Sequence, residues 1–219
     1  MEISGFDKSN GKPNLILIDL KVVIAILNWN GKNWLEKFLP NVISHSQNTD
    51  IYVIDNASTD DSVNFLRSHF PEVKIVQNPS NTGFAGGYNE GLNKIDADIY
   101  CLLNSDVEVT ENWLNPVLEL FEKNQNIAAI QPKILAYHRK NFFEFAGAGG
   151  GLIDNLGYPY SAEEFLTKLK KTKVSTMMKP RFFGLQVAVC LFVRKIFGQK
   201  TVLMKDFSLI RKKSTYVGV

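Results

Sequence analysis

Short apolar runs alternate with segments of helical periodicity along residues 22–130. Runs rich in Val and Ile, such as residues 22–27, predict strands that are buried on both faces of a parallel sheet. Segments with an apolar residue every three or four positions predict helices. Strands are expected at 22–27, 51–54, 73–76, 99–103 and 127–130, and helices at 34–43, around 60–66, at 83–92 and from about 115. This alternation predicts an α/β fold with a mostly parallel central sheet, flanking helices and right-handed crossovers.

Polar side chains cluster where three of the predicted strands end. The clusters are Asn28–Asn30, Asp55–Asn56 and Asn104–Asp106. In open parallel sheets, ligands bind at the carboxyl ends of the strands. The three clusters therefore predict a binding site along one edge of the sheet.

Each polar cluster allows a functional and a structural interpretation. Asp55 can accept hydrogen bonds from a nucleobase or a ribose, or it can cap a turn, and its spacing favours neither. The run Asn104-Ser105-Asp106 can hold a divalent cation beside a diphosphate, or form a turn with an Asx hydrogen bond, which its spacing slightly favours. The glycines of residues 81–89 permit either a phosphate at a helix N-terminus or tight packing of that helix on the sheet. They do not match G-x-G-x-x-G, which argues against a dinucleotide-dependent oxidoreductase.

Composition is that of an ordinary globular domain, because the 219 residues are 45% hydrophobic and 21% charged. No apolar run approaches the roughly 18 residues needed to span a bilayer, and the first twenty residues lack the features of a secretory signal. Cys101 and Cys190 suggest neither a disulfide framework nor a metal cluster, so we expect a cytoplasmic protein. Trp29, Trp34 and Trp113 are expected to be packing groups, although Trp29 lies beside the predicted site.

Charge is unevenly distributed along the chain. Residues 1–160 carry 12 Lys and Arg against 19 Asp and Glu, a net charge of −7, whereas residues 161–219 carry 13 against 3, a net charge of +10. A basic tail often binds nucleic acid or an anionic membrane. Aromatic side chains are not regularly interleaved with these lysines, so we expect no nucleic-acid partner. Membrane association is not indicated by the sequence.

Five segments, in their order and spacing, resemble family 2 glycosyltransferases, and most closely the bacterial rhamnosyltransferase-like branch that builds surface polysaccharide. The resemblance runs from about residue 21 to residue 160, and its segments are Ile26-Leu-Asn-Trp-Asn-Gly31, Val53-Ile-Asp-Asn-Ala-Ser-Thr-Asp60, Asn81-Thr-Gly-Phe-Ala85, Leu103-Asn-Ser-Asp-Val-Glu-Val109 and Gln131-Pro-Lys-Ile134. It implies a GT-A (nucleotide-diphospho-sugar transferase) fold. It also implies inverting transfer of a sugar from a nucleotide-diphosphate donor to a glycan or lipid-linked acceptor.

The resemblance also implies roles for the residues at the strand ends. Asp55 matches the family's base- and ribose-binding aspartate. Residues 104–106 match its D-x-D metal motif with Asn in the first position, so Asp106 is the single carboxylate for Mg²⁺ or Mn²⁺, and metal binding should be weaker. No catalytic residue is assigned, because this chain lacks the late acidic segment resembling E-E-I-D-L-C-W that carries the family's base. The residues expected to bind the donor are Asn28, Asn30, Asp55, Asn56, Asn81, Gly83, Asn104 and Ser105.

Residues 161–219 do not fit the family pattern as written. In a shifted reading frame, a coding sequence for 202–218 can encode a segment resembling E-E-I-D-L-C-W, and one for 163–187 can encode another family-like block. Residues 190–194 fit in the original frame. We therefore expect a leader at 1–20, a nucleotide-sugar-binding domain at 21–160, and an aberrant, irregularly packed basic tail at 161–219 in place of the acceptor and catalytic part. The chain is then either an active sugar transferase or a catalytically incomplete relative that binds nucleotide sugar without turnover.

Overall fold

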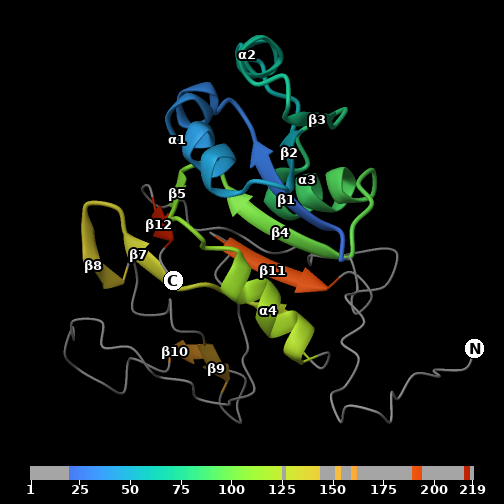
Figure 1. Cartoon of the computed structure of the whole chain (residues 1–219). Helices are drawn as coiled ribbons and strands as arrows, with labels where there is room; N and C mark the ends of the chain where they lie inside the picture. Colours follow the sequence, from blue (N-terminus) through green and yellow to red (C-terminus); the bar gives the residue numbers. More distant parts are fainter. Residues whose placement is uncertain are drawn as a thin grey trace, which may run out of the picture.

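The computed structural model describes residues 20–124, 127–143, 151–153, 159–161, 189–193 and 215–217. Its centre is a six-stranded sheet with the order β3-β2-β1-β4-β11-β6 (Figure 1). Strands β1 to β4 are parallel, β11 is antiparallel to β4, and β6 is antiparallel to β11. The strands are β1 (Val22–Asn28), β2 (Asp50–Asp55), β3 (Lys74–Gln77), β4 (Ile99–Asn104), β6 (Ala129–Ile130) and β11 (Val189–Val193). The predicted α/β fold with a mostly parallel sheet is confirmed.

Four described helices cover the two faces of this sheet. They are α1 (Lys32–His45), α2 (Ser62–His69), α3 (Gly83–Leu92) and α4 (Asn115–Lys123). Buried side chains of α1, α2 and α4 share one core, and those of α3 belong to a second core on the opposite face. Strand β1 supplies both cores, because Ile24 and Ile26 face the first whereas Val23 and Ala25 face the second. Successive side chains of a strand point to opposite faces, which explains why the central strands are apolar without alternation.

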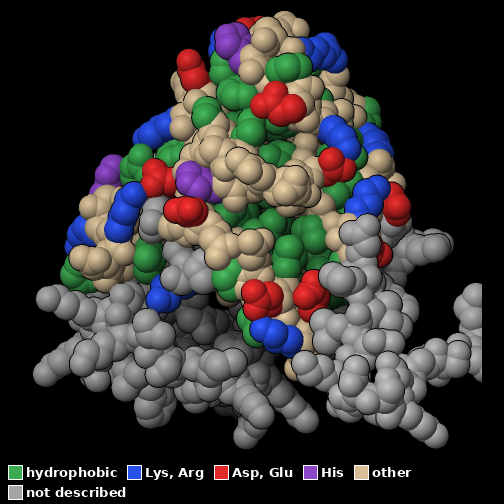
Figure 2. All heavy atoms as spheres, viewed as in Figure 1, with side chains coloured by type: hydrophobic (Ala, Val, Ile, Leu, Met, Phe, Trp, Pro, Cys, Tyr) green, Lys and Arg blue, Asp and Glu red, His purple; other side chains and the backbone are tan. Residues whose placement is uncertain are grey.

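Two smaller sheets accompany the central one. The larger has the order β5-β12-β7-β8, and the smaller pairs β10 with β9. Their strands are β5 (Val107–Val109), β7 (Ile134–Ala136), β8 (Arg139–Phe143), β9 (Gly151–Ile153), β10 (Pro159–Ser161) and β12 (Thr215–Val217). None of the described helices is long and apolar enough to cross a bilayer. Over the described part of the face in Figure 2, acidic and basic side chains are intermingled.

The basic tail is the part of the chain where the structure departs from expectation. The sequence predicts irregular packing for residues 161–219, but Val189–Val193 is a regular strand whose first four residues are buried. The expectation is therefore wrong for these residues, which include most of the segment 190–194 that fits the family pattern in its original frame. Apart from Ser161 and Thr215–Val217, the remainder of the tail lies outside the described residues, as do residues 1–19 of the leader.

Candidate functional site

Strand register brings the three polar clusters to one edge of the sheet. Asn28, the last residue of β1, is paired with Asp55 at the end of β2, and Leu27 is paired with Asn104 at the end of β4. The chain proceeds from β1 outward to β2 and β3, and then returns to place β4 on the other side of β1. The clusters therefore surround the point where the strand order reverses, which is where open α/β sheets bind ligands.

A buried hydrogen-bonded group joins the ends of β1 and β2. Nδ2 of Asn28 donates to Oδ1 of Asp55 at 3.1 Å and to Oγ of Ser58 at 3.1 Å, and the N–H of Ser58 donates to the other oxygen of Asp55 at 3.1 Å. Asn28 is 0% exposed and Asp55 is 1% exposed. As placed, Asp55 orients Asn28 and the turn that follows β2. Direct contact between Asp55 and a nucleobase or ribose stays a prediction.

The side-chain oxygen of Asn28 is buried and accepts no hydrogen bond from a described residue. Its orientation is fixed, because a carboxylate can only accept, so Nδ2 must face Asp55. Leaving a buried acceptor unpaired costs about 1–3 kcal/mol, and such atoms are rare in folded proteins. A methyl group on residue 31 would lie 2.5 Å from this oxygen, so only Gly31 fits beside it. The side-chain oxygen of Asn28 is therefore packed between the end of β1 and the start of α1.

Asn30 ties the loop after β1 to the loop after β2. Its Oδ1 accepts the N–H groups of Thr59 at 2.7 Å and Asp60 at 3.2 Å, and its own N–H donates to Ser58 at 2.9 Å. The backbone of Asn30 is left-handed, with φ 50°, a conformation that Asn tolerates better than most residues. Asp60 in turn accepts the N–H of Lys32 at 3.2 Å. Partial burial acts to raise the pKa of Asp60, but the hydrogen bonds that its carboxylate accepts outweigh burial and lower it.

A chain of asparagine side chains lies beside the end of β2. Nδ2 of Asn78 donates to Asn56 at 3.2 Å, and Nδ2 of Asn56 donates to Asn81 at 2.8 Å. Asn78, which directly follows β3, is absent from the predicted site residues. The rule that selects the polar ends of β1, β2 and β4 would also have selected it. Gly83 has φ 75°, and a side-chain methyl group there would have no atom within 4 Å, so backbone conformation rather than packing requires glycine.

Asn104 ends β4, Ser105 and Asp106 follow it at the same edge, and all three are partly buried. Burial raises the pKa of Asp106, and the hydrogen bond from its own backbone N–H offsets part of that rise. Within the described residues, no three His, Cys, Asp or Glu side chains come together as a metal site. One carboxylate is compatible with Mg²⁺ or Mn²⁺ only if phosphate oxygens of a ligand complete the coordination. The residues present thus fit a cation that arrives with a diphosphate.

The three tryptophans differ in their environment. Trp113 is fully buried, but Trp29 is 52% exposed and Trp34 is 42% exposed. Trp34 lies on the solvent side of α1, where its ring stacks on Phe38 with centroids 6.1 Å apart. Trp29 lies in the loop between β1 and α1, directly after Asn28. Trp34 is thus a partly exposed packing group, whereas Trp29 adds an exposed aromatic ring to the edge of the sheet that carries the site.

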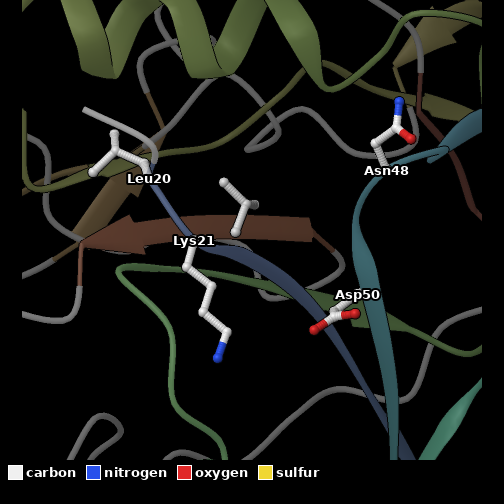
Figure 3. A pocket seen from close by; sticks show the side chains of 5 residues that line it. Leu20, Lys21, Asn48 and Asp50 are labelled. Atoms are coloured by element: carbon white, nitrogen blue, oxygen red, sulfur yellow. The ribbon is translucent and has the colours of Figure 1, made fainter. Parts of the chain in front are cut away.

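A separate hollow lies at the opposite edge of the sheet, at the amino ends of β1 and β2 (Figure 3). Its polar lining includes Lys21, Asn48 and Asp50. The carboxylate of Asp50 already pairs with Nζ of Lys74 at 2.7 Å. None of the predicted site residues lines this hollow, so it is distinct from the site at the carboxyl ends of the strands.

Comparison with known proteins gives matches over most of the described core. A family model described as Glycosyl transferase family 2 matches residues 22–190, which extends beyond the boundary expected at residue 160. N-acetylgalactosaminyltransferase 6 of Drosophila melanogaster is 33% identical over 78 residues, covering 36% of this chain and 12% of that protein. N-acetylgalactosaminyltransferase 4 of the same organism is 29% identical over 122 residues, covering 52% of this chain and 19% of that protein.

Part of the chain is also similar to solved structures. A mannosyltransferase from Pyrobaculum calidifontis, in complex with GDP-Man and Mn²⁺, aligns with a TM-score of 0.47 at 18% identity, over 52% of this chain and 35% of that chain. The chain spans less than a fifth of the length of the two Drosophila relatives.

Proposed function

This chain belongs to glycosyl transferase family 2 and has the GT-A fold, and we propose that it transfers a sugar from a nucleotide-diphosphate donor to a glycan or lipid-linked acceptor. The finer parts of the proposal are an inverting reaction and a place in surface polysaccharide synthesis. A cytoplasmic location stays a prediction. The relatives named N-acetylgalactosaminyltransferases support a nucleotide-sugar donor for this chain as well.

The observation that carries this proposal is the meeting of three strand ends at one edge. Asn28, Asp55 and Asn104 come from segments far apart in the chain, and the parallel register of β1 with β2 and β4 places them side by side. They lie where the strand order reverses, and ligands of open α/β sheets bind at such points. The exposed ring of Trp29 at this edge would give a nucleobase an apolar surface beside polar side chains.

The proposed reaction is a single displacement at the anomeric carbon. A base takes the proton of the acceptor hydroxyl, and the oxygen attacks the anomeric carbon as the bond to the donor's diphosphate breaks. The nucleoside diphosphate leaves with the electrons of that bond. A divalent cation, when bound, would neutralise the diphosphate as a leaving group, and Asp106 is the carboxylate that would hold it. Asp55 and Ser58 would keep Asn28 fixed while the donor occupies the edge.

The alternative function is binding of nucleotide sugar without turnover. It is favoured by the absence from the sequence of the acidic segment that carries the family's base. Both functions use the same donor site, so binding alone does not separate them.

Binding and turnover of the purified full chain should be measured separately. Calorimetric titration with UDP, GDP and dTDP in the presence of Mn²⁺ tests the donor site, and we expect at least one to bind. Release of nucleoside diphosphate from UDP-N-acetylgalactosamine and dTDP-rhamnose, with and without glycan acceptors, tests transfer. Binding with release identifies an enzyme, and binding without release identifies the non-catalytic relative. Absence of binding by all three diphosphates would refute both functions.

A further inference from the structure

Asn78, Asn56 and Asn81 form one directional chain of hydrogen bonds. Nδ2 of Asn78 donates to Oδ1 of Asn56 at 3.2 Å, and Nδ2 of Asn56 donates to Oδ1 of Asn81 at 2.8 Å. The second amide hydrogen of Asn78 goes to the carbonyl of Gly87 at 2.9 Å, and that of Asn56 goes to the carbonyl of Gly83 at 3.1 Å. All four amide hydrogens of the two inner residues are therefore used inside the protein.

Asn56 and Asn78 are buried, with 2% and 5% of their surface exposed. A methyl group on Gly87 would lie 2.8 Å from Nδ2 of Asn56, so the helix packs directly against this carboxamide. The backbone N–H of Asn56 donates to the carbonyl of Asn28 at 2.8 Å, which attaches the chain to the end of β1. The sequence predicts that Asn56 binds the donor, but neither of its amide hydrogens is available to a ligand.

Asn81 is the exposed end of the chain. Its Oδ1 accepts from Nδ2 of Asn56 and from the N–H of Gly83 at 2.9 Å, which turns the oxygen inward. No described residue accepts a hydrogen bond from Nδ2 of Asn81. Rotating this carboxamide by half a turn would place its N–H₂ group against that of Asn56, so the inner residues keep the amide hydrogens of Asn81 on the outside.

We propose that Asn78 and Asn56 are positioning residues that act through Asn81, holding its amide hydrogens toward an oxygen of the bound donor. This inference rests on the proposed function, because it needs a nucleotide-sugar donor at this edge. A donor offers acceptor oxygens in its nucleoside diphosphate part, on the nucleobase, the ribose and the phosphates, and further ones on its sugar. Each suits an N–H₂ group that is fixed in direction before the ligand arrives, since no rotamer freedom is then lost on binding.

A double-mutant cycle tests whether Asn78 acts through Asn81. Dissociation constants of the full chain for UDP, GDP, dTDP and the corresponding nucleotide sugars are measured for the wild type, N78A, N81A and the double variant. Loss of a hydrogen bond to the charged diphosphate predicts about tenfold weaker binding or more for N81A, and loss of one to a neutral oxygen predicts a smaller factor. N78A should weaken binding by a smaller factor, and it should have no further effect in the N81A background. The exposed residue Asn115, on the distant helix α4, provides the control N115A, which should bind as the wild type does.

The two parts of the donor give different results. A contact with the nucleoside diphosphate part weakens the binding of diphosphates and nucleotide sugars alike, whereas a contact with the transferred sugar weakens only the nucleotide sugars. Unchanged binding by N78A with a lower melting temperature, or effects of N78A and N81A that add in full, would overturn the positioning role. If the wild type binds none of these ligands, the proposed function fails, and the positioning role fails with it.

N81D supplies an independent test if N78A does not fold. Its carboxylate still accepts from Asn56 and Gly83, so its melting temperature should not fall, but the outward N–H₂ group is replaced by an oxygen. Binding should be lost by about tenfold or more, as for N81A. Binding equal to that of the wild type would show that the outward amide hydrogens of Asn81 contribute nothing, and would refute the inference.

Discussion

Replacing Gly91 by Ala tests how closely α3 packs on the sheet. A methyl group there would lie 2.6 Å from Cδ1 of Ile54, whereas unstrained carbon contacts are about 3.5–4.0 Å. Ile54 is 0% exposed and has little room to move away. Such overpacking costs about 1–3 kcal/mol. Alanine is preferred to glycine inside a helix by about 1 kcal/mol, but Gly91 is the penultimate residue of α3, so the gain is smaller. The net loss of stability should be about 1–2 kcal/mol.

Urea unfolding of the full chain measures this loss, because a lower midpoint at unchanged slope reports a change in stability alone. I54A removes the side-chain atoms that the new methyl group would meet, and by itself it should cost about 2–5 kcal/mol. In the double variant, the methyl group of residue 91 occupies part of the cavity. The combined loss should therefore fall short of the sum of the two single losses by about 1–2 kcal/mol.

The reasoning is refuted if G91A is as stable as the wild type, because helix propensity would then outweigh the contact. It is also refuted if the losses of G91A and I54A add in full, because the two sites would then not interact. Since Ile54 directly precedes Asp55, a displaced side chain would also reach the site, and weaker diphosphate binding by G91A is expected.

Three further predictions concern the polar groups beside the site. Y88F removes the hydroxyl that accepts the N–H of Leu27 at 3.3 Å, so urea unfolding should show a loss of about 1–3 kcal/mol, and an unchanged midpoint would contradict this role. Burial raises the pKa of Asp106 above 3.8, so Mn²⁺ affinity in the presence of UDP should begin to fall at a higher pH than a free aspartate would give; titration of D106N under the same conditions should show weaker Mn²⁺ binding without this pH dependence. The lowered pKa of Asp60, which accepts the N–H of Lys32, should stabilise the fold above pH 3.8, and this stability should be lost as the pH falls through the lowered value; acid unfolding of D60N should lack that contribution.

The strand ends could be predicted from sequence because two simple rules agree there. A continuous apolar run such as that of β1 predicts a strand buried on both faces, and the polar residue that ends it must then lie at the edge of the sheet. These rules locate Asn28, Asp55 and Asn104. They fix only the ends of the strands, so they do not show that Asp55 is 1% exposed.

The pattern of apolar and polar residues does not predict the direction in which a side chain of the site points. Whether Asp55 faces a ligand or Asn28 depends on the path of two loops, and Asn30 sets that path by accepting backbone N–H groups from the second loop. The exposure of Trp29 has the same origin, because it lies in the first of these loops. Tryptophan is more often buried than exposed, so the residue type alone predicts a buried side chain at position 29.

Strand β11 lies beyond the boundary expected at residue 160, and the reason why the sheet includes it lies in β4. Its run Ile99–Leu103 is buried on both faces, and a strand of that kind requires a hydrogen-bonded neighbour on each side. Strand β1 supplies one neighbour, whereas the strand predicted at 127–130 pairs with β11 and not with β4. Val189–Val193 is that second neighbour of β4. It comes from a distant segment of the chain and lies antiparallel to β4. Without Val189–Val193, strand β4 would be buried on both faces and yet have an open edge.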